Sequence, residues 1–186
     1  MINPVPKPVK TKKKSFPAKR KAKSPLRKLI ETIDSLDSSA CLIRNRFICW
    51  GCGNRAQYNH HFFHKSSHGA VRFDPHNHCP LCFACHQFKI HTKGDTEDLR
   101  DRLINEIGES NFESLKGKSR ELADRKQSTL EQILEQKARY LLMLFNTYPD
   151  RIPMLSDAAY KRAIRVFAKL FANFKLPLTN EKSCIN

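Results

Sequence analysis

The chain has 186 residues and carries 34 lysines and arginines against 18 aspartates and glutamates, which gives a formal net charge of +16 at pH 7. This length suits one ordinary domain with appendages, and the basic excess favours a polyanionic partner such as DNA. No apolar run approaches the ~18 residues of a membrane span, so we expect no membrane partner. The sequence shows no signal-peptide pattern, so we expect a cytoplasmic location.

Residues 1–23 form a basic arm. Eleven lysines and arginines and no acidic residue fall within the first 28 positions, interleaved with five prolines. This composition cannot bury apolar surface, so it predicts disorder and binding to DNA phosphates. A solubilising tail or a localisation signal is the alternative. The cations expected to contact DNA are Lys12, Lys13, Lys14, Lys19, Arg20 and Lys21.

The next segment, 24–46, leads into the centre of the chain. Ser24 as N-cap and Pro25 at the first helical position predict an amphipathic helix over residues 25–37. Residues 47–95 hold every histidine and most of the cysteines, and they form the predicted core. We expect the few strands of the fold to lie in this core.

Segment 96–147 is expected to hold two helices that follow the core. Thr96 or Asp95 caps the first helix, and Gly108 ends it. A capping box that opens at Ser128 begins a second, longer helix.

The last segment, 148–186, carries a predicted basic helix from Ser156 to about residue 174. Its lysines and arginines are expected to point outward. Because strands are confined to the core, the fold class expected for the whole chain is helix-rich α+β.

Seven cysteines without a secretion signal indicate metal-binding thiolates rather than disulfides. Two CxxC pairs, Cys49 with Cys52 and Cys82 with Cys85, can supply the four sulfurs of a closed, structural zinc site. Twenty-nine residues separate the pairs, more than the ~15–20 of a plain zinc ribbon. The zinc would therefore join the two ends of the segment 53–81, and we expect this segment to have a function apart from zinc binding. The cysteines without a CxxC partner are Cys41, Cys79 and Cys184, of which Cys79 is the credible substitute ligand.

All eight histidines lie between residues 57 and 91. We expect a strand that ends at His60 and His61, a loop, a second strand over residues 70–73, and a helix that carries His86 and His91. Adjacent strand residues point to opposite faces, so one histidine of the pair could bind a metal while the other faces a water molecule. The residues alone do not decide which histidine takes which role.

The order CxxC, His-His, Asn77, CxxC-His86 resembles the zinc-clamped HNH, or ββα-metal, nucleases. The resemblance implies that His61 is the general base, that Asn77 orients the loop carrying it, and that His60 and His86 bind a catalytic Mg²⁺ or Mn²⁺. His91 is a candidate third ligand, with a solvated surface histidine as the alternative. The fold then expected is a small ββα-metal core with a four-cysteine zinc, embedded in the helix-rich chain. The histidines expected to face substrate or to be structural are His64, His68, His76 and His78.

Two longer stretches, RFDPHN at residues 72–77 and LRDRLINEIG at 99–108, resemble the phage NinG (Rap) recombination endonucleases. The likeness covers about residues 25–145, and it implies cleavage of branched recombination or replication DNA inside an infected host cell. NinG sequences typically have Gly at the position of His60 and Asn at that of His86. The alternatives are a homing or restriction-type HNH nuclease, a non-catalytic zinc-stabilised nucleic-acid-binding protein, and an architectural zinc protein. The sequence allows a homodimer and does not predict one.

Overall fold

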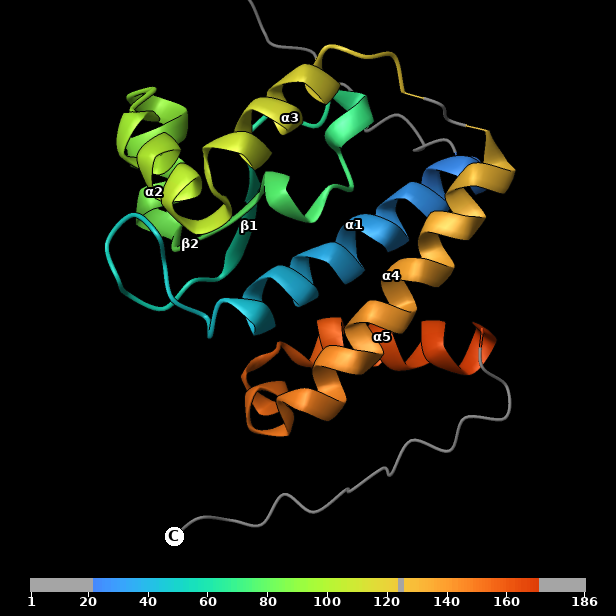
Figure 1. Ribbon diagram of the computed structural model, residues 1–186. Helices are drawn as coiled ribbons and strands as arrows, with labels where there is room; N and C mark the ends of the chain where they lie inside the picture. Colours follow the sequence, from blue (N-terminus) through green and yellow to red (C-terminus); the bar gives the residue numbers. More distant parts are fainter. Residues whose placement is uncertain (1–21, 124–125, 171–186) are drawn as a thin grey trace, which may run out of the picture.

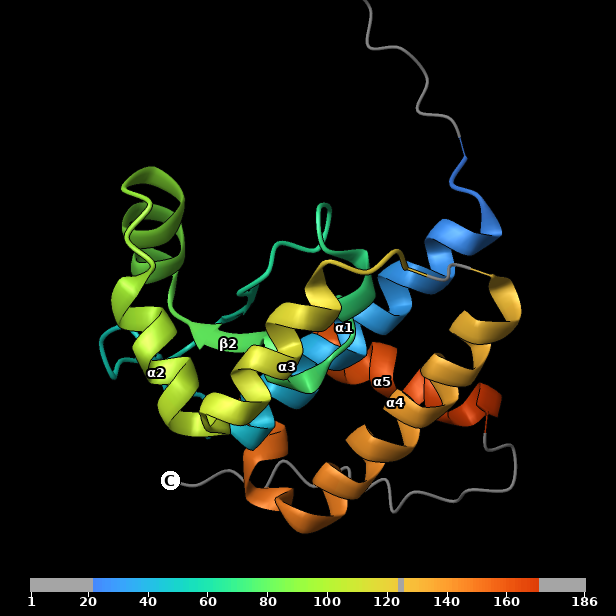
Figure 2. The ribbon, with the colours of Figure 1, turned by 45° about the horizontal axis from the view of Figure 1, so that its top comes forward.

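Two long helices, α1 (Pro25–Arg44) and α4 (Gln127–Thr147), cross and pack against each other in the computed structural model, which describes residues 22–123 and 126–170 (Figure 1). A third helix, α5 (Asp157–Leu170), packs on both, and the 3₁₀ helix η4 (Pro149–Met154) connects it to α4. The helical layer supports a two-stranded sheet and two shorter helices on the other side of α1 (Figure 2). The fold is thus helix-rich α+β with a very small sheet.

Helix α1 begins where the sequence predicts and ends about two turns later than predicted. The Ser24 hydroxyl accepts a hydrogen bond from the Arg27 amide at 3.2 Å, which caps the first turn. The predicted end at residue 37 is wrong, because the helix continues to Arg44. Polar residues at buried positions, Asp37 and Ser39, interrupt the apolar pattern there.

The sheet pairs β1 (Tyr58–His61) with β2 (His78–Leu81) in antiparallel register, so that His61 lies opposite His78. The strand predicted over residues 70–73 is wrong: this region holds the 3₁₀ helix η1 (Gly69–Val71). A second 3₁₀ helix, η2 (Pro75–Asn77), leads directly into β2. Strand β2 contains Pro80, which a strand tolerates at the edge of a sheet.

Three helices follow β2. The first is the π-helix η3 (Cys85–Thr92), followed by α2 (Glu97–Ile107) and α3 (Glu109–Ser119). Gly108 ends α2 with φ 83°, as predicted. The unpredicted α3 packs over η1 and η2. The hydrophobic core is continuous through α1, β2, α2, α3, α4 and α5.

The cap predicted for α4 is wrong, and the cap predicted for α5 is confirmed. The N-cap of α4 is Lys126 and makes no side-chain cap bond, so Ser128 lies within the first turn instead of capping it. For α5, the Ser156 hydroxyl accepts from the Ala159 amide at 3.3 Å, as expected. The predicted extension of this helix to residue 174 and the six arm cations lie outside the described residues. Within residues 22–123 and 126–170, no helix is long and apolar enough to cross a membrane.

Candidate metal centres and catalytic site

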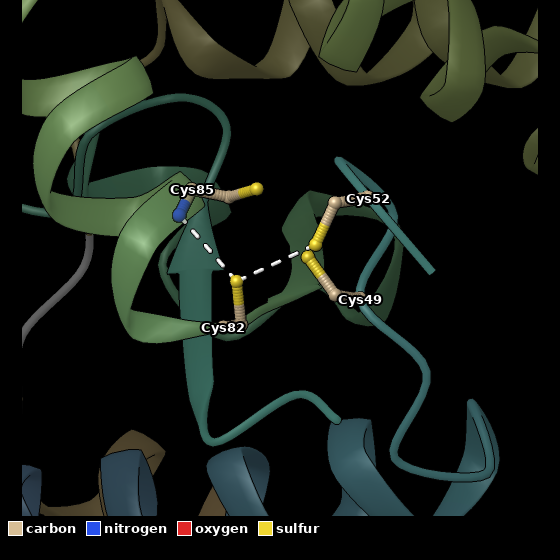
Figure 3. A group of neighbouring side chains, drawn as sticks. All are labelled: Cys49, Cys52, Cys82 and Cys85. Atoms are coloured by element: carbon tan, nitrogen blue, oxygen red, sulfur yellow. Dashed lines mark hydrogen bonds between the residues drawn. The ribbon is translucent and has the colours of Figure 1, made fainter. Parts of the chain in front are cut away.

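The four CxxC cysteines converge on one point (Figure 3). Cys49 and Cys52 lie on a tight turn after α1, where the Cys49 amide donates to the Asn54 carbonyl at 2.8 Å. Cys82 and Cys85 lie at the junction of β2 and η3. All four sulfurs are within 4.8 Å of one another, and Cys52 Sγ lies 3.6 Å from Cys82 Sγ.

These spacings fit a tetrahedral ion. Zinc–sulfur bonds of ~2.3 Å place the sulfurs of a tetrahedral site about 3.8 Å apart. Backbone amides of Gly51 and Cys85 donate to Cys49 Sγ at 3.3 Å and to Cys82 Sγ at 3.4 Å, as amides around metal thiolates do. Burial acts to raise the pKa of Cys82, but the Cys85 amide and the neighbouring thiols lower it to about 7. The cluster could therefore hold a metal ion such as zinc.

Three histidines form a second cluster. His60 of β1 lies with His86 and His91 of η3, their ring nitrogens all within 4.8 Å, and the Nε2 atoms of His86 and His91 are 3.3 Å apart. Residues five apart in an α-helix point about 140° away from each other. The i→i+5 pattern of a π-helix brings them onto adjacent turns of the same face. The local π geometry therefore explains how His91 joins His86.

The electrostatics of this histidine cluster favour neutral rings. Burial and the neighbouring His86 and His91 lower the pKa of His60 to about 3, and burial lowers that of His86. Neutral imidazole is the form that binds metal. Two zinc–nitrogen bonds of ~2.0–2.1 Å at a tetrahedral angle would separate the nitrogens by about 3.3 Å. Within the described residues no carboxylate joins the cluster, so its donor set suits Mn²⁺, Ni²⁺ or Zn²⁺ better than Mg²⁺.

His61 turns away from this cluster. Its Nε2 lies 3.1 Å from the Arg72 carbonyl oxygen. A carbonyl only accepts, so His61 donates Nε2–H and its Nδ1 carries the free lone pair. The side chain is 9% exposed, and burial, followed by the charge of Lys65, lowers its pKa to about 4. His61 is therefore neutral at pH 7 with one nitrogen able to accept a proton.

Two further residues, His78 and Asp34, fix the position of the Arg72 carbonyl, and the sequence did not predict either role. His78, only 2% exposed, places its Nε2 3.2 Å from the same oxygen, and its ring centroid is 4.7 Å from that of His61. The Arg72 guanidinium binds Asp34 of α1, with Nε 2.9 Å from Oδ1. Burial of Asp34 acts to raise its pKa, but the hydrogen bonds and charge of Arg72 outweigh this and lower it. Helix α1 thereby anchors the carbonyl that orients His61.

Asn77 is completely buried, and both the oxygen and the nitrogen of its amide form hydrogen bonds. Its Oδ1 accepts from the Phe63 amide at 2.7 Å, and its Nδ2 donates to the carbonyls of Phe63 and Val71, each at 3.0 Å. These bonds tie the segment after His61 to the start of β2. Because the side chain is fully buried, it is not accessible to substrate.

The remaining candidates stand apart from both clusters. His64 and His76 are solvent-accessible, with partners Ser66 and Asp74. His68 donates Nδ1–H to the Ser119 carbonyl at 3.0 Å. Cys79 is fully buried in β2 and is not part of the four-cysteine cluster.

Comparisons of the chain with models of protein families, with curated proteins and with solved structures found no significant match. Evidence on function therefore comes from the two clusters and the residues around them.

Proposed function

We propose that the chain is a metal-dependent DNA endonuclease with a ββα-metal core formed by β1, β2 and η3. The observation that carries the proposal is the divergence of two adjacent histidines. His60 joins a three-histidine cluster suited to a divalent ion, while His61 next to it presents a neutral ring with an oriented, free Nδ1. A DNA-binding protein without catalysis has no need of this pair.

In the proposed reaction His61 acts as general base. Its Nδ1 takes a proton from a water molecule whose oxygen bonds to the phosphorus, and the bond from phosphorus to the 3′-oxygen breaks. The products are 5′-phosphate and 3′-hydroxyl ends, the latter after protonation by solvent. Such proton transfer contributes ~10²–10⁴ to rate. A divalent cation held by His60, His86 and His91 would neutralise charge on the phosphate and on the leaving oxygen.

The other residues position this base. Asn77 fixes the backbone at Phe63, two residues after His61. Asp34 fixes Arg72, whose carbonyl oxygen accepts the hydrogen bond from His61 Nε2–H. The four-cysteine zinc closes the junction of β2 and η3, so it holds His86 in register with His60. We assign the zinc a structural role, because four protein ligands leave no open position.

The substrate proposed is branched recombination or replication DNA, as the resemblance to the NinG family implies. In support, the net charge of +16 favours DNA, and the exposed cations of α5 suit phosphate contacts better than base reading. A protein that contacts mostly phosphates gains selectivity from DNA shape and deformability.

The test of catalysis is replacement of His61 by alanine, with His76→Ala as the matched control because His76 is exposed and belongs to neither cluster. We expect His61→Ala to lower the rate of Mn²⁺-dependent cleavage at least 100-fold and to leave DNA affinity within a few-fold. His76→Ala should cleave at the wild-type rate. Wild-type cleavage by His61→Ala would remove the assignment of the base.

The test of substrate compares a four-way junction, a flap and a matched linear duplex at one salt concentration. We expect faster cleavage of the two branched DNAs with weak sequence bias. Equal rates on all three, or a sharp consensus among mapped cut sites, would favour a homing or restriction-type nuclease.

The metal is tested by replacing Mn²⁺ with Mg²⁺, which we expect to support slower cleavage at equal concentration.

A further inference from the structure

A separate hollow opens beside the proposed catalytic residues. Its volume is about 390 Å³, within the roughly 300–1,000 Å³ of ligand sites. It lies between α3 and the segment that follows β1, and Phe62 and Phe63 line it. Phe62 follows His61 directly, and consecutive Cα atoms are ~3.8 Å apart. The hollow therefore begins within one residue of the proposed base.

The inner surface of the hollow is aromatic. The ring centroid of Phe112 in α3 is 5.7 Å from that of Phe62 and 6.2 Å from that of Phe63. Phe112 is buried and supports the other two rings, which remain partly exposed. An exposed aromatic face can stack on a nucleobase, and such stacking favours binding without sequence preference.

The rim of the hollow is cationic, with Arg100 of α2, Lys116 of α3 and Arg120 just after α3. Lys116 is paired with Glu113 at 2.9 Å. Neither arginine forms an ion pair with any residue of the described ranges, and the Arg100 guanidinium lies 5.7 Å from the centre of the Phe112 ring. Two arginines that have no acidic partner among the described residues, and that lie beside aromatic rings, complement a phosphate attached to a base.

We propose that this hollow binds one unpaired nucleotide of the DNA substrate, next to the scissile phosphate. The base stacks on Phe62 and Phe63, and its phosphate contacts Arg100 and Arg120. The proposal rests on the proposed nuclease function and adds a reason for branched substrates. Extracting a base from a duplex requires unpairing and unstacking it, whereas a flap or junction supplies a base that is already unpaired.

The experiment measures binding by full-length His61→Ala protein, which separates affinity from cleavage. The DNAs are a linear duplex and the same duplex with a single-stranded flap, at equal salt. We expect the further substitutions Arg100→Ala and Arg120→Ala together to weaken flap binding at least tenfold and duplex binding less than threefold. The matched control, Arg162→Ala with Arg165→Ala on α5, removes the same charge and should show no such selectivity.

A second readout reports on stacking. With 2-aminopurine as the first unpaired base of the flap, binding of the His61→Ala protein should quench its fluorescence, and the added substitution Phe63→Leu should reduce that quenching at saturating protein. Equal weakening of both DNAs, or undiminished quenching with both the arginine and phenylalanine variants, would overturn the proposal. If the hollow binds flap DNA selectively but the wild-type protein does not cleave, the nucleotide-binding proposal is supported and the nuclease proposal is contradicted. If the wild-type protein cleaves but the arginine variants show no selective loss of flap binding, the nuclease proposal is supported and the nucleotide-binding proposal is contradicted.

Discussion

Asn77 connects three backbone groups through one buried side chain, and this gives the sharpest test of how His61 is positioned. Aspartate has the same shape but no amide hydrogens, so Asn77→Asp would leave the carbonyls of Phe63 and Val71 without their donor. Each unsatisfied buried group costs ~1–3 kcal/mol. We expect a free energy of unfolding lower by at least about 2 kcal/mol, measured by urea denaturation.

The control for this variant is His76→Asn, at the neighbouring exposed position, which should leave stability within about 0.5 kcal/mol. If Asn77→Asp proved as stable as wild type, the hydrogen bonds of Asn77 could not be what fixes the segment after His61.

Gly51 is required by the close approach of the two cysteine turns. A Cβ atom built on Gly51 would lie 2.9 Å from Cys85 Sγ, closer than such contacts occur. We therefore expect Gly51→Ala to push the sulfurs apart and weaken zinc binding at least tenfold in competition with a chromophoric chelator. Gly117→Ala is the control, because a Cβ there meets nothing within 4 Å. Equal zinc affinity of the two variants would contradict a four-sulfur site with this geometry.

At the level of elements, helices α1 and α4 share a buried ion pair. Asp37 and Lys137 are 2% and 8% exposed, with Oδ1 3.1 Å from Nζ, and Asp37 Oδ2 has no hydrogen-bond partner among the described residues. Burial, only partly offset by Lys137, raises the pKa of Asp37 to about 7. The folded chain therefore holds a proton here that the unfolded chain releases near its ordinary pKa of ~3.9, so this contribution to stability falls as pH rises from about 4 to 7.

Replacement of Asp37 by asparagine should remove this pH dependence. Relative to wild type, we expect Asp37→Asn to gain stability between pH 4 and pH 8, by on the order of 4 kcal/mol at most. Asp34→Asn, one turn earlier in α1, should behave oppositely: the lowered pKa of Asp34 stabilises the fold above about pH 4, so that variant loses stability there. Denaturation curves at several pH values that ran parallel for all three proteins would contradict both assignments.

The elements that could be predicted from the sequence are those with local signals. Ser24 and Pro25 mark the start of α1, and Gly108 marks the end of α2, because caps and left-handed glycines act within a few residues. Strand β2 gave no such signal, since Pro80 argues against a strand and the pairing with β1 comes from a segment twenty residues earlier. Helix α3 has only two buried apolar residues, Phe112 and Leu115, which is too short a pattern to predict.

The candidate site likewise contains residues that the sequence indicates and contacts that it does not. Spacing groups the cysteines and points to His60, His61 and His86, because these side chains lie in or beside the strands and CxxC turns. His91 is a candidate third ligand from the sequence, but the π-helical geometry that brings it beside His86 is not visible there. The anchoring of Arg72 by Asp34 joins residues 38 positions apart, and the shared carbonyl between His61 and His78 depends on the sheet register. Such contacts follow from tertiary packing and leave no local pattern.

At the scale of the whole molecule, the charge is unevenly distributed along the chain. Residues 1–21 hold eight of the 34 lysines and arginines and no acid, so their deletion lowers the net charge from +16 to +8. The described fold begins after them, and Lys23, whose Nζ lies 2.7 Å from Glu31, is retained. Deletion of residues 1–21 therefore separates the arm from the fold without disturbing α1.

On the proposed DNA substrate, this deletion should weaken binding by a similar factor for every sequence and structure, because phosphate contacts carry no sequence information. Each lost contact flattens the slope of log K against log salt by ~0.9, so eight contacts would change it by about 7 at most. The measurement is affinity across a salt series for the full chain, the deletion, and a chain whose arm has the same residues in shuffled order. We expect the shuffled arm to restore both affinity and slope, since charge and not order acts here. A slope unaffected by deletion would show that the arm makes no phosphate contacts, and a shuffled arm that fails on branched DNA alone would show that the arm reads DNA structure instead of charge.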